Sequence, residues 1–308
     1  INAYSALAAI AIQSDQNDQH GGQSIPAFDF YMAPGVLKTF KKEYKQALYE
    51  LLDFTDFISF VNMDKVAMAI DKLNSIHVDI SDFDNFYKES KEVRRIFEKA
   101  YDTALAKTDR ATYQAMEAFV HNLNTMHSRA GAQVPFSSIN FGTDTSPEGR
   151  MVMKNYLLSV DAGLGKNETP IFPISIFKIK EGVNYNPGDP NYDLFRLSCK
   201  VSAKRLFPNF SFMDSPFNAQ YYKGDYNTEV CYMGCRTRVI GNVVDPNKAV
   251  TPGRGNLSFT SINLPRLGIK HGIVSNEKTD LDGFYEELGN LMDLVCEQLL
   301  ERFEIQCN

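Results

Sequence analysis

The sequence predicts an α/β protein with a mainly parallel sheet and a large helical insertion. After residue 127, short apolar runs bounded by Gly and Pro, such as PFSSINFG and PIFPISIFKI, alternate with helical stretches. Alternation of this kind is typical of βα units, whose strands pair in parallel. Residues 36–127 instead show an almost continuous helical pattern, and the chain finishes with a long amphipathic segment.

The first element is predicted as a helix over residues 3–13, which are rich in alanine. Gly21 and Gly22 end this helical region, and a short strand is expected after them. A Gly-Gly pair at such a junction serves either the geometry of the chain or the close approach of its backbone to a ligand. The residues alone leave both interpretations open.

The helical insertion is predicted from about residue 36 to residue 127. Its first segment places apolar side chains at the spacing of one helical face: Leu37, Phe40, Tyr44, Ala47, Leu48, Leu51 and Leu52. These helices either pack on the core and on a partner subunit or are ordinary solvated helices. The sequence supports the two interpretations about equally.

Four strands are expected after the insertion, near residues 133–140, 171–179, 237–244 and 257–264. Ser146, Pro147 and Glu148 predict a helix start, with the serine as N-cap, the proline at the first helical position and the acid in the first turn. The last predicted helix follows Asp280 and carries one apolar stripe.

Composition excludes several classes of protein. The formal net charge of −6 over 308 residues argues against a surface that coats nucleic acid, because most of the molecule would repel phosphate. No run of eighteen apolar residues and no basic signal segment is present, so we expect no membrane span and a cytoplasmic protein. The chain has no initiator methionine, and we expect it to open inside a structural element.

Five cysteines are spread along the chain: Cys199, Cys231, Cys235, Cys296 and Cys307. An odd number at distant positions favours reduced thiols over a disulfide framework. Cys231 and Cys235 have the spacing of half a zinc site, but no second pair of ligands accompanies them, because His271 stands alone. We therefore expect no metal bound to this chain.

One stretch, residues 229–265, holds the residues most typical of a chemical site. Gly234 precedes Cys235 and allows a tight turn that would present the sulfur at a loop tip. Arg254 and Asn256 are expected to return toward the same volume from the second arm of the loop. The alternative is that Cys235 is a small buried hydrophobe, as free cysteines usually are.

Five sequence blocks resemble one protein family in content and order. The blocks are HGGQSIP at 20–26, NTMHSRAGAQVPFSSINFGT at 124–143, ETPIFPI at 168–174, GDPNYDLFRLSCKVSAKRLFPNFSF at 188–212, and YMGCRTRV followed by GRGNLSFTSINLPR in the loop. Together they resemble the oxygen-sensitive, glycyl-radical (class III) ribonucleoside-triphosphate reductases over almost the whole chain.

The resemblance implies a fold and a chemistry. The family folds as a ten-stranded α/β barrel with a finger loop through its centre, so residues 1–308 are expected to be a partial catalytic barrel domain. Cys235 matches the cysteine that becomes a thiyl radical and takes the 3′ hydrogen of the ribose. Asn256 matches the asparagine that hydrogen-bonds the ribose hydroxyls, a role suited to an amide.

Further residues are candidates for substrate binding. Triphosphates are commonly bound by helix N-termini and backbone amides, which points to the helix start at Ser146 and to the glycine turn. The candidate substrate-binding residues are His20, Gly21, Gly22, Ser146 and Arg254.

The same resemblance implies partners and further parts. Ribonucleoside triphosphates would be the substrates, nucleotide effectors would regulate the enzyme, and the enzyme would be a homodimer. An activating enzyme with an iron–sulfur cluster would use S-adenosylmethionine to install the glycyl radical. Residues 1–308 contain neither the RVCGY-like segment of that glycine nor the four-cysteine structural zinc site. We therefore expect no bound cofactor and no activity from this chain alone, and a non-catalytic nucleotide-binding module is the alternative.

Overall fold

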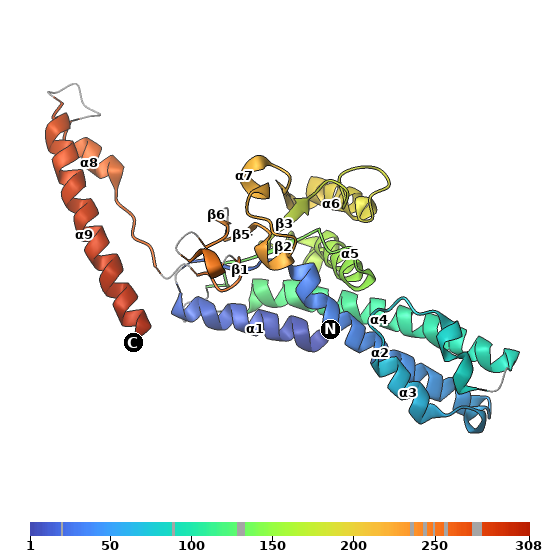
Figure 1. The fold of residues 1–308 in the computed structure, drawn as a ribbon. Coiled ribbons are helices and arrows are strands. Elements are labelled where there is room, and N and C mark those ends of the chain that lie inside the picture. Colours follow the sequence, from blue (N-terminus) through green and yellow to red (C-terminus); the bar gives the residue numbers. More distant parts are fainter. Residues whose placement is uncertain are drawn as a thin grey trace. The chain divides into compact units, whose positions relative to one another are not determined.

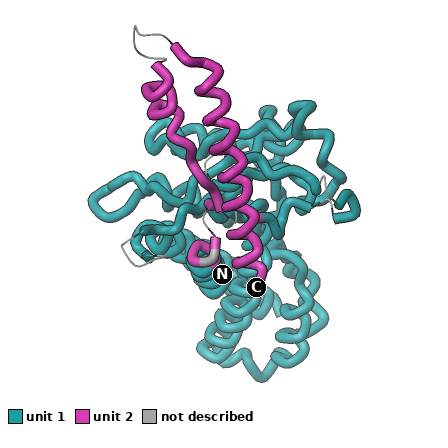
Figure 2. Tube along the Cα trace, turned by 90° about the vertical axis from the view of Figure 1, so that its left-hand side faces the viewer, with its two compact units in different colours: residues 1–14, 22–254 teal, residues 15–21, 255–308 magenta. Residues whose placement is uncertain are grey.

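The computed structural model describes residues 1–19, 21–87, 90–127, 133–234, 237–242, 245–248, 250–255, 258–272 and 279–308. The chain divides into two compact units, which Figure 2 shows in different colours. Unit 1 contains residues 1–14 and 22–254, and unit 2 contains residues 15–21 and 255–308.

Most helices and all strands of the described residues lie in unit 1 (Figure 1). The helices are α1 (Asn2–Asp18, of which residues 15–18 belong to unit 2), α2 (Phe28–Phe54), α3 (Met63–Asp71), α4 (Lys91–Thr125), α5 (Pro147–Ala162), α6 (Tyr192–Arg205) and α7 (Pro216–Ala219). The strands are β1 (Gln23–Ile25), β2 (Ser137–Phe141), β3 (Ile174–Ile179), β4 (Asn209–Phe212), β5 (Cys231–Met233) and β6 (Thr237–Val239). Unit 2 contains α8 (Leu264–Lys270) and α9 (Leu281–Cys307).

Strands β1 to β4 form a parallel sheet in their order along the chain. Parallel neighbours need long connections, and the helices between these strands supply them. The predicted α/β class with a mainly parallel sheet is therefore confirmed, and β2 and β3 fall where strands were expected. The ten-stranded barrel stays a prediction, since the described residues form this four-stranded sheet and one hairpin, β5–β6.

One face of the sheet packs on helices through aromatic rings. Phe141 of β2 lies 5.2 Å from Tyr156 of α5 and 5.6 Å from Phe177 of β3, measured between ring centroids. Phe28 of α2 lies 5.8 Å from Tyr156 and 5.1 Å from Phe119 of α4. All five rings are at most 1% exposed. Aromatic side chains bury large apolar areas, so this cluster fixes α2, α4 and α5 to the sheet.

The helices predicted within residues 36–127 are confirmed, but the first of them begins earlier, and the description of this region as an insertion stays a prediction. Helix α2 starts at Phe28 and includes Pro34, where the sequence predicted a start near residue 36. A proline inside a helix removes one backbone hydrogen bond. The apolar stripe of α2 is almost fully buried along its length, and this packing outweighs the hydrogen bond lost at Pro34.

One predicted strand is wrong, and another is shorter than expected. Residues 258–263 form no strand, and α8 begins at Leu264, inside the predicted range 257–264. Asn263 caps α8 by accepting a hydrogen bond from the Arg266 amide, a helix-start signal that the β-type composition concealed. The strand predicted at 237–244 is confirmed over Thr237–Val239, and residues 243 and 244 lie outside the described residues.

Unit 2 is built from α8 and α9, which Figure 2 shows in magenta. The predicted last helix is confirmed as α9, and Asp280 caps it by accepting a hydrogen bond from the Gly283 amide. His271 Nε2 lies 2.7 Å from Glu287 Oε2 and links the end of α8 to α9. Within the described ranges, no helix combines the length and the apolar character that a membrane span requires.

The loop after β2 is fixed by buried polar side chains. Asp29 of α2 accepts hydrogen bonds from the backbone amides of Gly142 at 2.8 Å and Asp144 at 3.1 Å. Asn184 and Asn191 donate to the Gly142 carbonyl oxygen at 2.9 and 3.1 Å. Burial raises the pKa of Asp29 to about 6, although the two backbone hydrogen bonds act in the opposite direction.

Asp29 makes the stability of the fold depend on pH. Between the ordinary value of 3.8 and a pKa of about 6, the folded chain retains a proton that the unfolded chain has lost. The contribution of Asp29 to the free energy of unfolding therefore falls as pH rises through this window, by about 3 kcal/mol, and changes no further above it. Asp29→Asn keeps the acceptor oxygen without the charge, so urea unfolding between pH 4 and 7 should show a smaller fall. Parallel curves for the two proteins would contradict this.

Candidate functional site

The second face of the sheet carries polar side chains in place of aromatic rings. Ser138 and Asn140 of β2, Lys178 of β3 and Ser211 of β4 are at most 6% exposed. They alternate along the strands with the apolar residues of the first face. Ser24 of β1 pairs with Ser138, so it lies on the same polar face of the sheet. Buried polar groups cost free energy unless they find hydrogen-bond partners.

Tyr232 of the β5–β6 hairpin supplies partners for the serines and for Asn140. Asn140 Nδ2 donates to the Tyr232 carbonyl oxygen at 2.9 Å, and the Tyr232 amide donates to Asn140 Oδ1 at 2.8 Å. Ser24 Oγ donates to the same carbonyl oxygen at 2.7 Å, and Ser138 Oγ does so at 3.3 Å. Ser211 Oγ donates to the Tyr232 hydroxyl at 2.8 Å. Tyr232 thus connects the hairpin to β1, β2 and β4.

A buried ion pair fixes the chain just before β5. Lys178 Nζ lies 2.8 Å from Glu229 Oε2, and the two side chains are 1% and 3% exposed. Lys178 also donates to the Pro26 carbonyl oxygen, and Thr143 Oγ1 donates to Glu229 Oε2, each at 2.8 Å. Burial acts most strongly and lowers the pKa of Lys178, but Glu229, together with Cys231 and Asp29, outweighs it and holds that pKa above its ordinary value. The lysine is therefore charged at neutral pH.

The other side of the hairpin is apolar. Cys231, Met233 and Val239 form a small buried cluster. Burial raises the pKa of the Cys231 thiol, which favours its neutral form. The chain after β6 contacts the segment that precedes β5. The Thr251 amide and hydroxyl both donate to the Asn227 carbonyl oxygen, at 2.7 and 3.2 Å.

Gly22 allows the end of β5 to approach the sheet closely. A Cβ atom on Gly22 would lie 2.5 Å from Gly234 Cα and 2.8 Å from Phe136 Cδ1. Gly234 has a φ of +63°, a conformation that favours glycine. Gly22 therefore serves the geometry of the chain at this point, and the approach of a ligand to the glycine pair stays a prediction.

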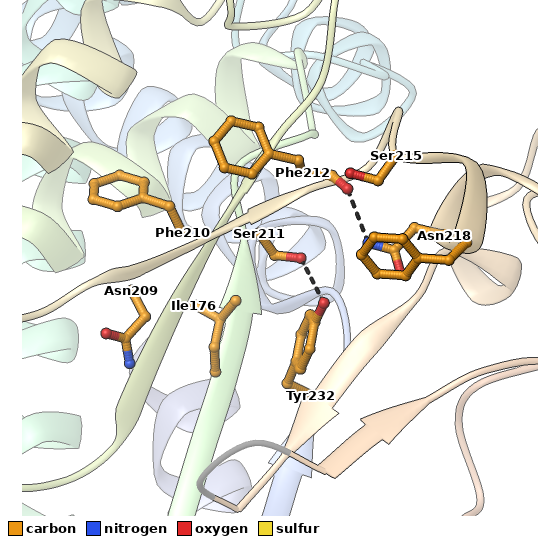
Figure 3. A pocket seen from close by; sticks show the side chains of 9 residues that line it. Ile176, Asn209, Phe210, Ser211, Phe212, Ser215, Asn218 and Tyr232 are labelled. Atoms are coloured by element: carbon orange, nitrogen blue, oxygen red, sulfur yellow. Dashed lines mark hydrogen bonds between the residues drawn. The ribbon is translucent and has the colours of Figure 1, made fainter.

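A pocket of about 340 Å³ opens beside the hairpin (Figure 3). Its lining includes the Ser211–Tyr232 hydrogen bond and Asn218, whose Nδ2 donates to the Phe212 carbonyl oxygen at 2.8 Å. The full lining is Ile176, Asn209, Phe210, Ser211, Phe212, Ser215, Phe217, Asn218 and Tyr232. Aromatic walls with a few hydroxyl and amide groups are typical of sites for small polar ligands.

Comparison with known proteins decides the family. The model of the family described as anaerobic ribonucleoside-triphosphate reductase matches residues 1–308. The chain belongs to the anaerobic ribonucleoside-triphosphate reductase family. The resemblance carried by the five sequence blocks is therefore confirmed.

Three relatives named anaerobic ribonucleoside-triphosphate reductase illustrate the similarity. The Haemophilus influenzae protein is 31% identical over 234 residues, which are 76% of this chain and 31% of that protein. The Escherichia coli protein is 32% identical over 65% of this chain and 26% of its own length. The Enterobacteria phage T4 protein is 34% identical over 66% of this chain and 33% of its own length. The chain spans about a third of these reductases or less.

The predicted catalytic residues of this reductase family member stay predictions. Cys235, Asn256 and His20 lie outside the described residues. Arg254 is described, and its Nη2 donates to the carbonyl oxygens of Ile240 and Val250 at 3.4 and 3.2 Å. The expected convergence of Cys235, Asn256 and Arg254 is therefore untested.

Ser146 has the capping role that the sequence predicts. Its hydroxyl accepts a hydrogen bond from the Gly149 amide at 3.0 Å and donates to Asp144 Oδ2 at 2.9 Å. Glu148 in the first turn is buried, as is Asp144. A substrate-binding role for Ser146 stays a prediction, as does one for Gly21, whose carbonyl oxygen accepts from Gln16 Nε2 at 3.3 Å.

Sequence reasoning missed the residues that bind the hairpin to the sheet. Lys178 stands inside the apolar strand ISIFKI, and Asn140 ends the alternating run SSIN. A lysine or an asparagine at an inward position of a buried strand is a usable signal, because such groups need partners. Their partners Glu229 and Tyr232 are distant in sequence and carry no comparable signal. Over the part of the chain that the structure describes, no group of three or more His, Cys, Asp or Glu residues could hold a metal ion.

Replacing Gly22 with alanine should loosen the hairpin. The added methyl group would overlap Gly234 and Phe136, so the free energy of unfolding should fall by about 1–3 kcal/mol. Gly165→Ala is the matched control, because nothing lies within 4 Å of its added methyl group. Urea unfolding of both variants measures the difference, and equal losses at Gly22 and Gly165 would refute the close approach as a constraint.

Proposed function

We propose that the chain is the central part of the catalytic domain of an anaerobic ribonucleoside-triphosphate reductase, which converts ribonucleoside triphosphates to 2′-deoxyribonucleoside triphosphates. One observation carries the proposal. The family block YMGCRTRV coincides with the β5–β6 hairpin, and Tyr232 of this block is fixed on the polar face of the sheet. Cys235 lies in the sequence between the two strands of that hairpin.

The proposed reaction starts at Cys235. Its thiol would give a hydrogen atom to a glycyl radical, and the resulting thiyl radical would take the 3′ hydrogen of the ribose. Asn256 would bind the ribose hydroxyls, because an amide both donates and accepts hydrogen bonds. This chemistry needs a sulfur placed within contact of C3′ and shielded from water. The buried contacts of the hairpin support such placement.

The substrate would lie next to the hairpin. The pocket beside Tyr232 offers hydroxyl and amide groups that suit a sugar or a base, and its volume falls in the range of small-ligand sites. Arg238 lies 4.9 Å from the Phe217 ring at this pocket, and its charge suits a phosphate group. Arg254, the helix start at Ser146 and the Gly21–Gly22 pair remain our candidates for the rest of the triphosphate.

Further parts of the reductase complete this proposal. The glycyl radical, the activating enzyme that uses S-adenosylmethionine, the nucleotide effectors, the homodimer, the zinc site and the cytoplasmic location all follow from the resemblance. No RVCGY-like segment occurs in residues 1–308. Removal of one member of a catalytic unit usually costs nearly the whole effect, so we propose that these residues alone are inactive.

Cys235→Ser in the intact reductase that contains this chain should abolish turnover. A serine O–H bond is too strong to exchange hydrogen with a glycyl radical, while the affinity for nucleotide should stay within about threefold, because the contacts that bind substrate are unchanged. Cys199→Ser is the matched control, since Cys199 is an exposed thiol on α6. Turnover that survives Cys235→Ser would show that another sulfur carries the radical.

The 308-residue chain serves as a second control for this proposal. It is incubated without oxygen with activating enzyme, S-adenosylmethionine, a reductant and a ribonucleoside triphosphate. We expect no glycyl doublet in the electron paramagnetic resonance spectrum and no deoxyribonucleotide. Nucleotide binding by an intact protein that never turns over would instead favour the binding-module alternative.

A further inference from the structure

The hairpin is not attached to the sheet by a strand ladder. β5 pairs only with β6 among the described strands, and the two form a sheet separate from β1–β4. The attachment therefore depends on side chains. Asn140 offers the Tyr232 peptide group one donor and one acceptor, which is what the backbone of a neighbouring strand would offer.

We propose that Asn140 is a positioning residue for the reduction, because it sets the distance and tilt of β5 relative to the polar face of the sheet. The inference rests on the proposed function. It assigns to Asn140 no contact with substrate, and its effect passes through the Tyr232 peptide group.

The side-chain amide of Asn140 has a fixed orientation because it makes further hydrogen bonds. Its Nδ2 lies 3.0 Å from Ser24 Oγ and 3.3 Å from the Ile25 carbonyl oxygen, in addition to the Tyr232 carbonyl oxygen. A flipped amide would turn its oxygen toward two carbonyl oxygens, so only one orientation is allowed. Asn140 is 0% exposed, so its own amide group is shielded from solvent.

The hydrogen bonds between Asn140 and Tyr232 lie close in sequence to the proposed catalytic cysteine, so they can affect its placement. Tyr232 precedes Cys235 by three residues in the sequence. Ser24 and Ser138 each make one bond to the Tyr232 carbonyl oxygen, whereas Asn140 makes one bond to that oxygen and one to the amide. A pair of opposed hydrogen bonds fixes direction as well as distance. Misplacement of a reacting group by about 1 Å can cost about a hundredfold in rate.

The first arm of the test measures the contact itself in the 308-residue chain. Asn140→Ala removes both hydrogen bonds, and Asn140→Asp keeps the acceptor but turns a carboxylate oxygen toward the Tyr232 carbonyl oxygen. Both should lower the hydrogen-exchange protection of the Tyr232 amide by about tenfold or more. Ser175→Ala is the matched control, because Ser175 is a buried serine on the opposite face of the same sheet. Unchanged protection at Tyr232 would overturn the proposal.

The second arm measures turnover in the intact reductase. Asn140→Ala should lower kcat by about a hundredfold and leave the KM for nucleotide within about threefold, while Ser24→Ala lowers kcat less. Loss of Tyr232 protection with unchanged kcat would overturn the positioning role. A wild-type reductase that makes no deoxyribonucleotide would overturn the proposed function and, with it, the positioning role of Asn140. The hydrogen-exchange measurement would still show separately whether Asn140 fixes the hairpin.

Discussion

The ion pair between Lys178 and Glu229 is the interaction on which the placement of the hairpin depends. Removing two charges from water costs several kcal/mol for each ion, so such a pair persists only with close contact and further hydrogen bonds. The charged atoms lie 2.8 Å apart, Lys178 also donates to the Pro26 carbonyl oxygen, and Thr143 also donates to Glu229 Oε2. A buried pair contributes little net stability, but its directional contacts specify one arrangement. Here they place the chain that enters β5 at the carboxyl end of β3.

Each later contact of the hairpin extends that arrangement. The Tyr232 peptide group is oriented by Asn140, and the end of β5 reaches the sheet only because Gly22 lacks a side chain. The hairpin therefore has polar contacts toward the sheet and an apolar cluster on its other side. The radical reaction that we propose at this loop would need accurate placement more than charged groups, and such contacts would supply placement. The same face of the sheet borders the pocket in which we place the substrate.

Patterns local in the sequence predicted much of the fold, whereas contacts between distant residues had to come from the structure. The apolar stripe of α2 and the cap at Ser146 are set by neighbours, and both were predicted correctly, except for the start of α2. The strand predicted at 257–264 was wrong. The pattern of apolar residues suggested a strand, but Asn263 is the N-cap of helix α8. Lys178 and Asn140 could have been noticed as polar residues in buried strands. Their partners could not, because nothing in the sequence pairs Lys178 with Glu229 across fifty residues.

The most direct test of this account is a double-mutant cycle on the ion pair, measured as the free energy of unfolding in urea. Lys178→Met and Glu229→Leu should each cost about 3–5 kcal/mol, because each removes the close partner of a buried charge, and Lys180 lies only 3.9 Å from Glu229. The double variant should cost clearly less than the sum of the two, since no unpaired charge remains. Losses that add to within about 0.5 kcal/mol would contradict the account, because the two side chains would then act independently.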